Sequence, residues 1–148
     1  MLNYNSVIKN EIKQESISVK EISPVIKINL RGKKREFLTN VGKNLNMILP
    51  TEANTSTTSD KLTAIWLSPD EWMIISNELA SKDTNKSDLY EMLFNSISKT
   101  NLGAVIDVTD QFVQLELKGE NVYEIFSAGS PFNFNEFKEK KDQQLRLF

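Results

Sequence analysis

The sequence predicts an α+β fold with one β-α-β-β-α-β unit followed by a partial second unit. Two observations support this prediction. Apolar side chains recur at every second position in some segments, which is the period of a half-buried strand. In others they recur at three- and four-residue spacing, which is the period of an amphipathic helix. The strand segments are 24–30, 62–77 and 104–119, and the helix segments are 33–48, 87–100 and 119–128.

The first strand and the first helix follow from the segment that ends at Pro50. In "PVIKINL" the apolar Ile28 and Leu30 alternate with Lys27 and Asn29, which predicts a strand with one buried face. The next stretch has apolar residues on one helical face and ends at the proline, which cannot continue a helix. These apolar residues are Phe37, Leu38, Val41 and Leu45.

The stretch "LTAIWLSPDEWMIIS" predicts a β-hairpin whose turn is centred on its Pro-Asp pair. Counting outward from that turn pairs Trp66 with Met73 across the hairpin. The same count pairs Trp72 with Leu67. The two tryptophans are therefore expected on opposite faces, and both faces carry large apolar groups. One face is expected to cover helices, and the other to need a second layer or another protein. Residues 51–61 are almost entirely polar and predict a solvated loop.

The second half of the chain begins a similar series of elements. Ser87 is a candidate N-cap for the helix over 87–100, and "AVIDVTDQFVQLELKG" predicts two strands or one long bent strand. "ENVYEIFSAG" predicts a short helix that turns its apolar residues inward, namely Val122, Ile125 and Phe126. The final "QLRLF" alternates as a strand does. The first six elements match the ferredoxin-like, split β-α-β arrangement, and the later ones match the start of a second unit.

We expect a single domain over residues 24–148, preceded by a polar N-terminal extension over residues 1–23. The length of 148 residues suits one domain. The extension has no apolar run of signal-peptide length. No stretch approaches the ~20 apolar residues that a membrane helix needs. We therefore expect a cytoplasmic protein without membrane association.

The composition lowers the expectation of an enzyme. The chain has no histidine and no cysteine, so it lacks disulfides, a thiolate nucleophile, and the commonest metal ligand and general base. A catalyst would have to work with carboxylates, Lys, Tyr, Ser or Thr. The formal net charge of −2 gives no basic excess for a phosphate backbone, so we expect no nucleic-acid partner.

Two pairs of carboxylates are the main candidates for acid–base or metal chemistry. Asp70 and Glu71 are adjacent, and adjacent strand residues point to opposite faces, so we expect both to be solvated turn residues. Asp107 and Asp110 flank a threonine, but their spacing matches no metal-binding motif. The sequence has no glycine-rich phosphate loop and no nucleophile elbow. We therefore assign no catalytic, cofactor-binding or metal-binding residue to this chain.

Four aromatic residues are candidates for a partner interface instead. They are Trp66 and Trp72 in the hairpin, and Phe132 and Phe134 in the loop "SPFNFNEF". Several large aromatics in one loop indicate that the loop docks onto something. The competing interpretation is that both tryptophans belong to the core and that the loop docks onto the domain's own sheet.

Three stretches, in this order, match the pattern of a known family. They are "INLRGKKREFLTNVGKNLNMILP", "AIWLSPDEWMIIS" and "AVIDVTDQFVQLELKGENVYEIFSAGSPFNF". They resemble the gamma subunit of heterotetrameric sarcosine oxidase. In that family the first is a strand, a helix and a Leu-Pro exit, and the second is a W-L-x-P-D-E-W hairpin. The third is a D-V-S-D segment, L-x-L-x-G, a helix and a G-C-P-L-D-L loop. The hairpin is the most specific of the three. Ser130 and Asn133 stand where the family has Cys and Asp.

The resemblance covers roughly residues 22–137 and implies a fold similar to the folate-binding domain of aminomethyltransferases. It also implies a non-catalytic structural subunit of a complex that oxidises sarcosine to glycine and passes the one-carbon unit to tetrahydrofolate. Sites for FAD, FMN, NAD and tetrahydrofolate are expected on the other subunits, so the implied partners are the alpha, beta and delta subunits. The family continues through further strands and a last helix, so we expect a domain that is short at its C-terminal end.

Two other functions compete with this one. A standalone folate-binding, aminomethyltransferase-like protein would need a pterin pocket with a well-placed carboxylate, for which Asp107 or Asp110 are the candidates. A ligand-free ferredoxin-like interaction domain would need neither. Neighbouring genes for a large flavoprotein and a folate-domain protein would favour the sarcosine oxidase subunit.

Overall fold

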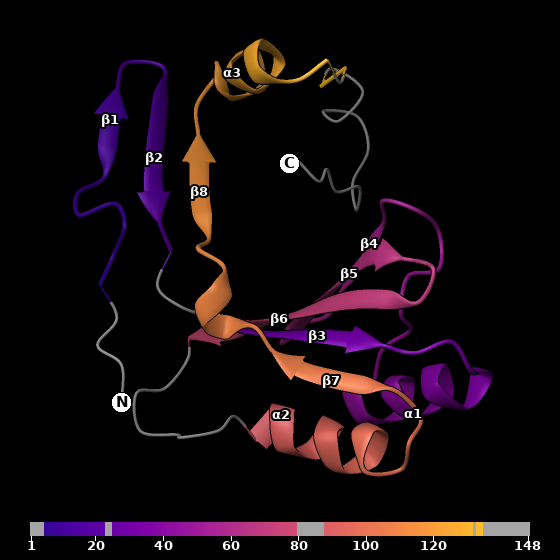
Figure 1. The fold of residues 1–148 in the computed structure, drawn as a ribbon. Helices are drawn as coiled ribbons and strands as arrows, with labels where there is room; N and C mark the ends of the chain where they lie inside the picture. Colours follow the sequence, from indigo (N-terminus) through magenta and orange to yellow (C-terminus); the bar gives the residue numbers. More distant parts are fainter. Residues whose placement is uncertain (1–4, 23–24, 80–87, 132, 135–148) are drawn as a thin grey trace. The chain divides into compact units, whose positions relative to one another are not determined.

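The computed structural model describes residues 5–22, 25–79, 88–131 and 133–134, which divide into two compact units (Figure 1). The five-stranded unit contains residues 25–109. The three-stranded unit contains the described residues before 24 and those from 110 onward. Both units combine antiparallel sheet with helix, so the α+β class predicted from the sequence is confirmed.

The five-stranded unit is an antiparallel sheet with two helical segments on one face. In the sheet the strand order is β4-β5-β6-β3-β7. The strands are β3 (Val25–Arg31), β4 (Ser56–Thr58), β5 (Leu62–Ser68), β6 (Glu71–Leu79) and β7 (Ala104–Asp107). The helices are α1 (Arg35–Leu45) and α2 (Asp88–Leu93), and α2 continues as the π-helical turn η1 (Phe94–Ser98).

The core of this unit lies between the helices and one face of the sheet (Figure 1). Alternate residues of each strand share a face, and the residues that β3, β5 and β6 contribute to this core are even-numbered. The helices contribute residues at three- and four-residue spacing. The buried residues of this core include Ile28, Leu30, Phe37, Val41, Leu45, Ala64, Trp72, Ile74, Leu93, Ile97 and Val105.

The Phe37 ring explains two of the glycines in this unit. The ring is fully buried, and its centroid lies 5.8 Å from that of Trp72. A Cβ atom at Gly32 would lie 2.5 Å from the ring, and one at Gly103 would lie 2.9 Å from it. Both positions therefore require glycine because no side-chain atom fits between the backbone and the ring.

The three-stranded unit is a smaller antiparallel sheet followed by one helix. Its strands are β1 (Ile12–Gln14), β2 (Ile17–Glu21) and β8 (Leu115–Lys118), in the order β1-β2-β8, and its helix is α3 (Val122–Gly129). The junction between β8 and α3 is fixed to the β1–β2 turn. Asn121 Nδ2 donates to Ser16 Oγ at 3.0 Å, and a Cβ at Gly119 would lie 2.1 Å from the Ser16 carbonyl oxygen.

The predicted hairpin and the three predicted helices are present, with ends within a few residues of those expected. The stretch 104–119 forms two strands, and these lie in different sheets. No strand is predicted for residues 1–23 or 51–61, yet β1, β2 and β4 form there. The candidate cap Ser87 and the final "QLRLF" lie outside the described residues.

One prediction about the later part of the chain differs from the structure. We expect Ile125 to point inward, but its side chain is 49% exposed and α3 contains no buried residue. The periodicity identifies the helix correctly, but it does not show whether another layer covers the apolar side of that helix. The single domain over 24–148 stays a prediction; the described residues of that range fall in two compact units.

Candidate functional site at the hairpin turn and the second face of its sheet

The Asp70 side chain holds the hairpin turn together and fixes it to β3. Its Oδ1 atom accepts a hydrogen bond from Ser68 Oγ at 2.9 Å, and its Oδ2 atom lies 3.5 Å from Lys33 Nζ. The Asp70 carbonyl also accepts from the Gly32 N–H at 2.9 Å. The hydrogen bond from Ser68 and the charges of Lys33 and Arg31 lower the pKa of Asp70 below its ordinary value. The carboxylate is therefore kept ionised as a structural acceptor.

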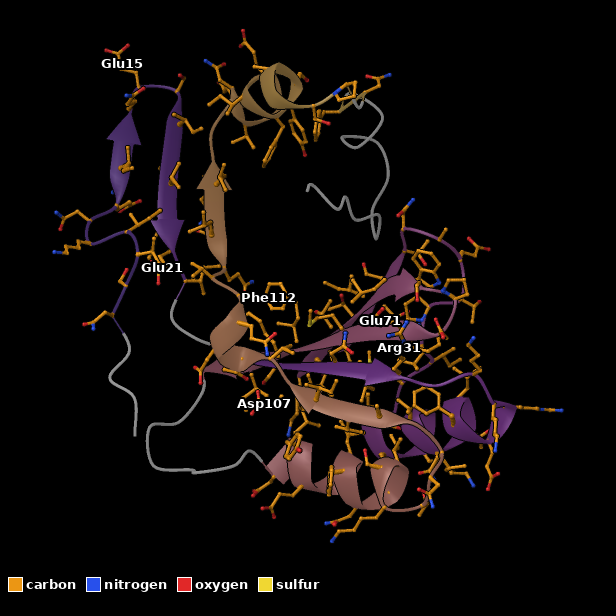
Figure 2. All side chains as sticks on the ribbon, in the orientation of Figure 1. Glu15, Glu21, Arg31, Glu71, Asp107 and Phe112 are labelled. Carbon is orange, nitrogen blue, oxygen red and sulfur yellow. The ribbon has the colours of Figure 1, made fainter. Side chains whose placement is uncertain are left out.

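The Glu71 side chain is engaged in the sheet in a similar way. Its Oε1 atom accepts from Asn29 Nδ2 at 2.8 Å, and in β3 the cross-strand partner of Glu71 is Arg31 (Figure 2). Asp70 lies in the turn and Glu71 is the first residue of β6. The structure thus gives the two carboxylates different partners, and they form no shared acid–base pair. Our expectation that both are solvated is wrong in part, because both are half-buried.

Trp72 anchors the hairpin to the loop that follows α1. Its side chain is only 2% exposed, and its indole Nε1 donates to the Pro50 carbonyl at 2.7 Å. A buried indole N–H normally needs such an acceptor. With Asp70 and Glu71, every side chain of the "DEW" triplet therefore has a partner inside the five-stranded unit.

The hairpin register differs from the predicted one by one residue. Ser68 pairs with Glu71 as the turn predicts, but the register then shifts at Leu67, so that Trp66 pairs with Trp72 instead of Met73. Cross-strand partners share a face of the sheet. An extra residue in one strand moves each side chain beyond it in that strand to the opposite face from the one predicted. The prediction that the two tryptophans lie on opposite faces is therefore wrong.

This register changes what the tryptophans can do. Trp66 is half-buried and packs against the core, while Trp72 belongs to the core itself. Both lie on the helix-covered face, in agreement with the competing interpretation that the tryptophans are core residues. A partner interface at these two rings stays a prediction, but Trp72 offers a partner almost no accessible surface.

The second face of the five-stranded sheet is apolar as well. It carries the odd-numbered residues of the central strands, including the half-buried Ile65, Met73 and Ile75. On β7 it carries Ile106, which pairs with Asn29 and is 49% exposed. The prediction that both faces of the hairpin carry large apolar side chains is confirmed. Lys27 lies on this face too and is 5% exposed, with its Nζ donating to the Val25 carbonyl at 3.3 Å.

The carboxylate of Asp107, the last residue of β7, bonds to the backbone of the chain. Asp107 Oδ1 accepts from the Thr109 N–H at 2.9 Å, and Thr109 Oγ1 accepts from the Lys27 N–H at 3.1 Å (Figure 2 labels Asp107). These bonds tie the end of β7 to β3. Asp110 is exposed. No group of three or more acidic side chains with metal-binding geometry occurs within the described residues.

The aromatic loop after α3 is described only in part. Phe134 is 4% exposed and stacks on Phe126 of α3, with ring centroids 5.4 Å apart. This contact is with a helix of the same chain, whereas the sequence interpretation expected the loop to dock onto the domain's own sheet. Phe132 lies outside the described residues. Whether either ring meets a partner stays a prediction.

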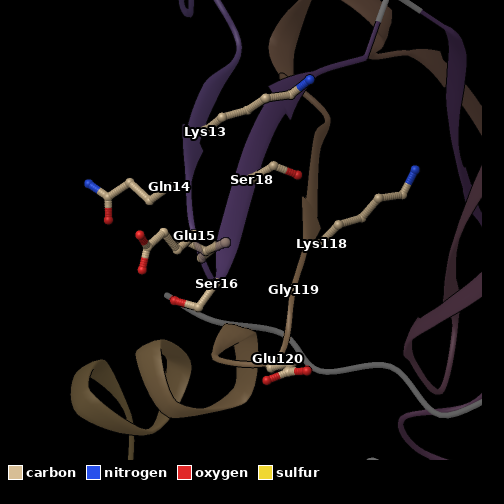
Figure 3. A pocket seen from close by; sticks show the side chains of 9 residues that line it. Lys13, Gln14, Glu15, Ser16, Ser18, Lys118, Gly119 and Glu120 are labelled. Atoms are coloured by element: carbon tan, nitrogen blue, oxygen red, sulfur yellow. The ribbon is translucent and has the colours of Figure 1, made fainter.

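A shallow hollow of about 430 Å³ lies beside the β1–β2 turn and the end of β8 (Figure 3). Each of its two lysines forms an ion pair with a glutamate two residues earlier in the chain. Lys13 Nζ lies 3.1 Å from Glu11 Oε2, and Lys118 Nζ lies 2.8 Å from Glu116 Oε2. The hydrogen bond from Lys118 lowers the pKa of Glu116. Because both cations already have carboxylate partners, the hollow has no evident preference for an anion.

Comparison with known proteins identifies the fold. No family model and no curated protein matches the sequence. Among solved structures the chain is similar to one chain of the heterotetrameric sarcosine oxidase from Corynebacterium sp. U-96, determined in complex with pyrrole 2-carboxylate. The TM-score is 0.69 and the sequence identity is 17%. The alignment covers 84% of this chain and 61% of the length of that one. The chain therefore shares its fold with a chain of a hetero-oligomeric oxidase.

No helix among the described residues is long and apolar enough to cross a membrane.

Proposed function

We propose that this chain is a non-catalytic accessory subunit of a flavin- and folate-linked sarcosine oxidase complex. The observation that carries the proposal is the fold likeness over 84% of the chain to a chain of heterotetrameric sarcosine oxidase. The "WLSPDEW" hairpin, which resembles the gamma subunit of that complex, supports the same assignment from the sequence.

We infer that the five-stranded unit is a ferredoxin-like unit with one additional edge strand. The order β7-β3-β6-β5, with a helical connection after β3 and another after β6, is what a split β-α-β arrangement requires. Strand β4 adds to its edge beside β5. The β8–α3 segment then corresponds to the start of the second unit of an aminomethyltransferase-like fold.

The contacts of the carboxylates support an accessory role over a catalytic one. Asp70, Glu71 and Asp107 each accept a hydrogen bond from a group of the same chain, at distances of 2.8–2.9 Å. A general base must be free to reach a substrate proton, or must exchange its partner for one. Following the resemblance, we place the FAD, FMN, NAD and tetrahydrofolate sites on the alpha, beta and delta partners.

The test is to isolate the complex through this subunit. The full chain is tagged and expressed in cells of the organism that it comes from. The purified material is expected to show flavin absorbance and sarcosine-dependent oxygen consumption. The same chain expressed alone is expected to carry no flavin and to oxidise nothing. Recovery of the tagged chain without flavin would contradict the proposal, as would flavin or turnover in the isolated chain.

A conservative variant separates this proposal from a standalone folate-binding protein. Asp107→Asn keeps an oxygen that can accept from the Thr109 N–H, but it removes the negative charge. An accessory subunit is expected to tolerate this change, with turnover per flavin unchanged. If the isolated chain binds tetrahydrofolate and Asp107→Asn abolishes that binding, the folate-binding protein is favoured instead.

A further inference from the structure

The sheet of the three-stranded unit has one apolar face and one polar face. Its register places Val19 opposite both Ile12 and Leu117, and alternate residues of each strand share a side. The apolar face therefore consists of Ile12, Ile17, Val19, Leu115 and Leu117, with Gln14 and Glu21 toward its ends. The polar face consists of Lys13, Ser18, Lys20, Glu116 and Lys118.

The described part of the chain covers the apolar face of this sheet only in part. Ile17, Val19 and Leu117 are half-buried, and at one end of the face Glu21 accepts hydrogen bonds from Ser6 Oγ and the Ile8 N–H. Strands β1, β2 and β8 contain no buried residue. Ile12 is 51% exposed and Leu115 is 44% exposed. Helix α3 lies beyond the end of β8 rather than across the face (Figure 1), and its own Ile125 is 49% exposed. The five-stranded unit, by contrast, buries Ile28, Leu30 and Phe37 completely. A three-stranded sheet gains its stability by burying such a face.

From this partly exposed face we propose that the three-stranded unit docks onto an amphipathic helix of a partner subunit. The proposal rests on the accessory-subunit function proposed above and identifies the surface that this function uses. The outer strands of a three-stranded sheet lie about 10 Å apart, and four residues of a strand extend over about 13 Å. A helix with its side chains is about 10–12 Å wide. The face therefore accommodates one helix over two to three turns.

A membrane surface and a second copy of the chain fit this face less well. Proteins that lie on membranes combine apolar residues with adjacent cations, but here Lys13, Lys20 and Lys118 are all on the opposite face. A two-fold dimer would bury the same patch on both copies. That patch is roughly 200–300 Å², well below the ~800 Å² per partner of a stable interface. A larger partner can add contacts elsewhere and so does not depend on this area alone.

The experiment uses two variants that introduce the same charge at neighbouring residues on opposite faces. Val19→Glu places a carboxylate in the centre of the apolar face. Ser18→Glu places one on the polar face between Lys13 and Lys118, where it is electrostatically favourable. Each full-length chain is tagged, expressed in its own cells and purified, and the flavin recovered per chain is measured. We expect Val19→Glu to reduce the recovered flavin at least tenfold and Ser18→Glu to leave it within twofold of the unsubstituted chain.

Hydrogen exchange provides a second measurement that does not depend on how the variants fold. In the free, unsubstituted chain, we expect the amides of β2 and β8 to exchange much faster than those of β3 and β6. In the flavin-containing complex, we expect exchange in β2 and β8 to slow at least tenfold.

The outcomes separate this inference from the proposed function. If flavin co-purifies equally with both variants, the docking face is wrong and the accessory function stands. If no flavin co-purifies even with the unsubstituted chain, both are wrong. If the free chain is a dimer and Val19→Glu dissociates it, the occupant of the face is a second copy of the chain. Slow exchange of β2 and β8 already in the free chain would show that the chain covers this face itself. Either result overturns the proposal.

Discussion

The indole of Trp72 gives a quantitative test of how the hairpin is held. Trp72→Phe keeps an aromatic ring in the core but removes the Nε1 hydrogen that bonds to the Pro50 carbonyl at 2.7 Å. Pro50 is itself buried, so its carbonyl would lose its donor without access to water. An unsatisfied buried acceptor costs about 1–3 kcal/mol. The smaller ring also leaves part of the indole volume empty, which adds to the loss. We expect Trp72→Phe to lower the free energy of unfolding by about 2–4 kcal/mol.

Trp66→Phe is the matched control because the two residues are cross-strand partners on the same face. Trp66 is only half-buried, so the same substitution removes less buried surface, and we expect a loss below about 1.5 kcal/mol. The measurement is urea denaturation followed by far-UV circular dichroism, with an unchanged m-value required for each variant. Equal losses in the two variants, or a loss below 0.5 kcal/mol for Trp72→Phe, would refute the proposed anchoring of the hairpin through Pro50.

Three further predictions follow from other contacts. Gly103→Ala would place a Cβ 2.3 Å from a β3 carbonyl oxygen, so we expect urea denaturation to show a loss of about 1–3 kcal/mol in the free energy of unfolding. The control is Gly129→Ala, whose Cβ would meet nothing within 4 Å and whose free energy of unfolding is expected to change by less than ~0.5 kcal/mol. The lowered pKa of Asp70 means that its contribution to stability is present above about pH 4 and is lost as the pH falls through the folded-state pKa. Asp70→Asn is therefore expected to reduce the slope of unfolding free energy against pH below pH ~4, and an unchanged slope would contradict this. Thr109→Val removes the acceptor of a β3 N–H at 3.1 Å and is expected to cost about 1–3 kcal/mol, while Thr109→Ser should retain most of the stability.

Most of the five-stranded unit can be predicted from the sequence because local signals and burial agree there. The alternation around Ile28 and the helical spacing from Phe37 to Leu45 both correspond to buried faces. The hairpin turn was also predictable because proline and aspartate specify it. The bulge at Leu67 was not, because nothing in the local sequence marks the extra residue. One unmarked residue was enough to reverse the predicted facing of Trp66.

The three-stranded unit was harder to predict for a different reason. Strands β1 and β2 are short, and their alternation is interrupted by the turn between them. β2 pairs with β8, about a hundred residues further along the chain, and no local pattern specifies that pairing. The strand β4, "STT", has no apolar side chain and forms by pairing with the edge of β5. Such strands depend on their neighbours, so composition alone indicates a loop.

The resemblance and the proposed interface depend on different parts of the chain. The most specific stretch, "WLSPDEW", uses Asp70, Glu71 and Trp72 in bonds within the five-stranded unit. A motif whose residues all have internal partners is maintained by folding, so its likeness to a family carries information about the fold. The residues that a partner would contact are instead those whose apolar surface the described chain leaves exposed, such as Ile12 and Leu115. A docking face of this kind requires only that alternate positions be apolar, and many sequences satisfy this requirement. The proposed docking face is therefore expected to diverge faster in sequence than the hairpin, while keeping its pattern of one apolar and one polar face.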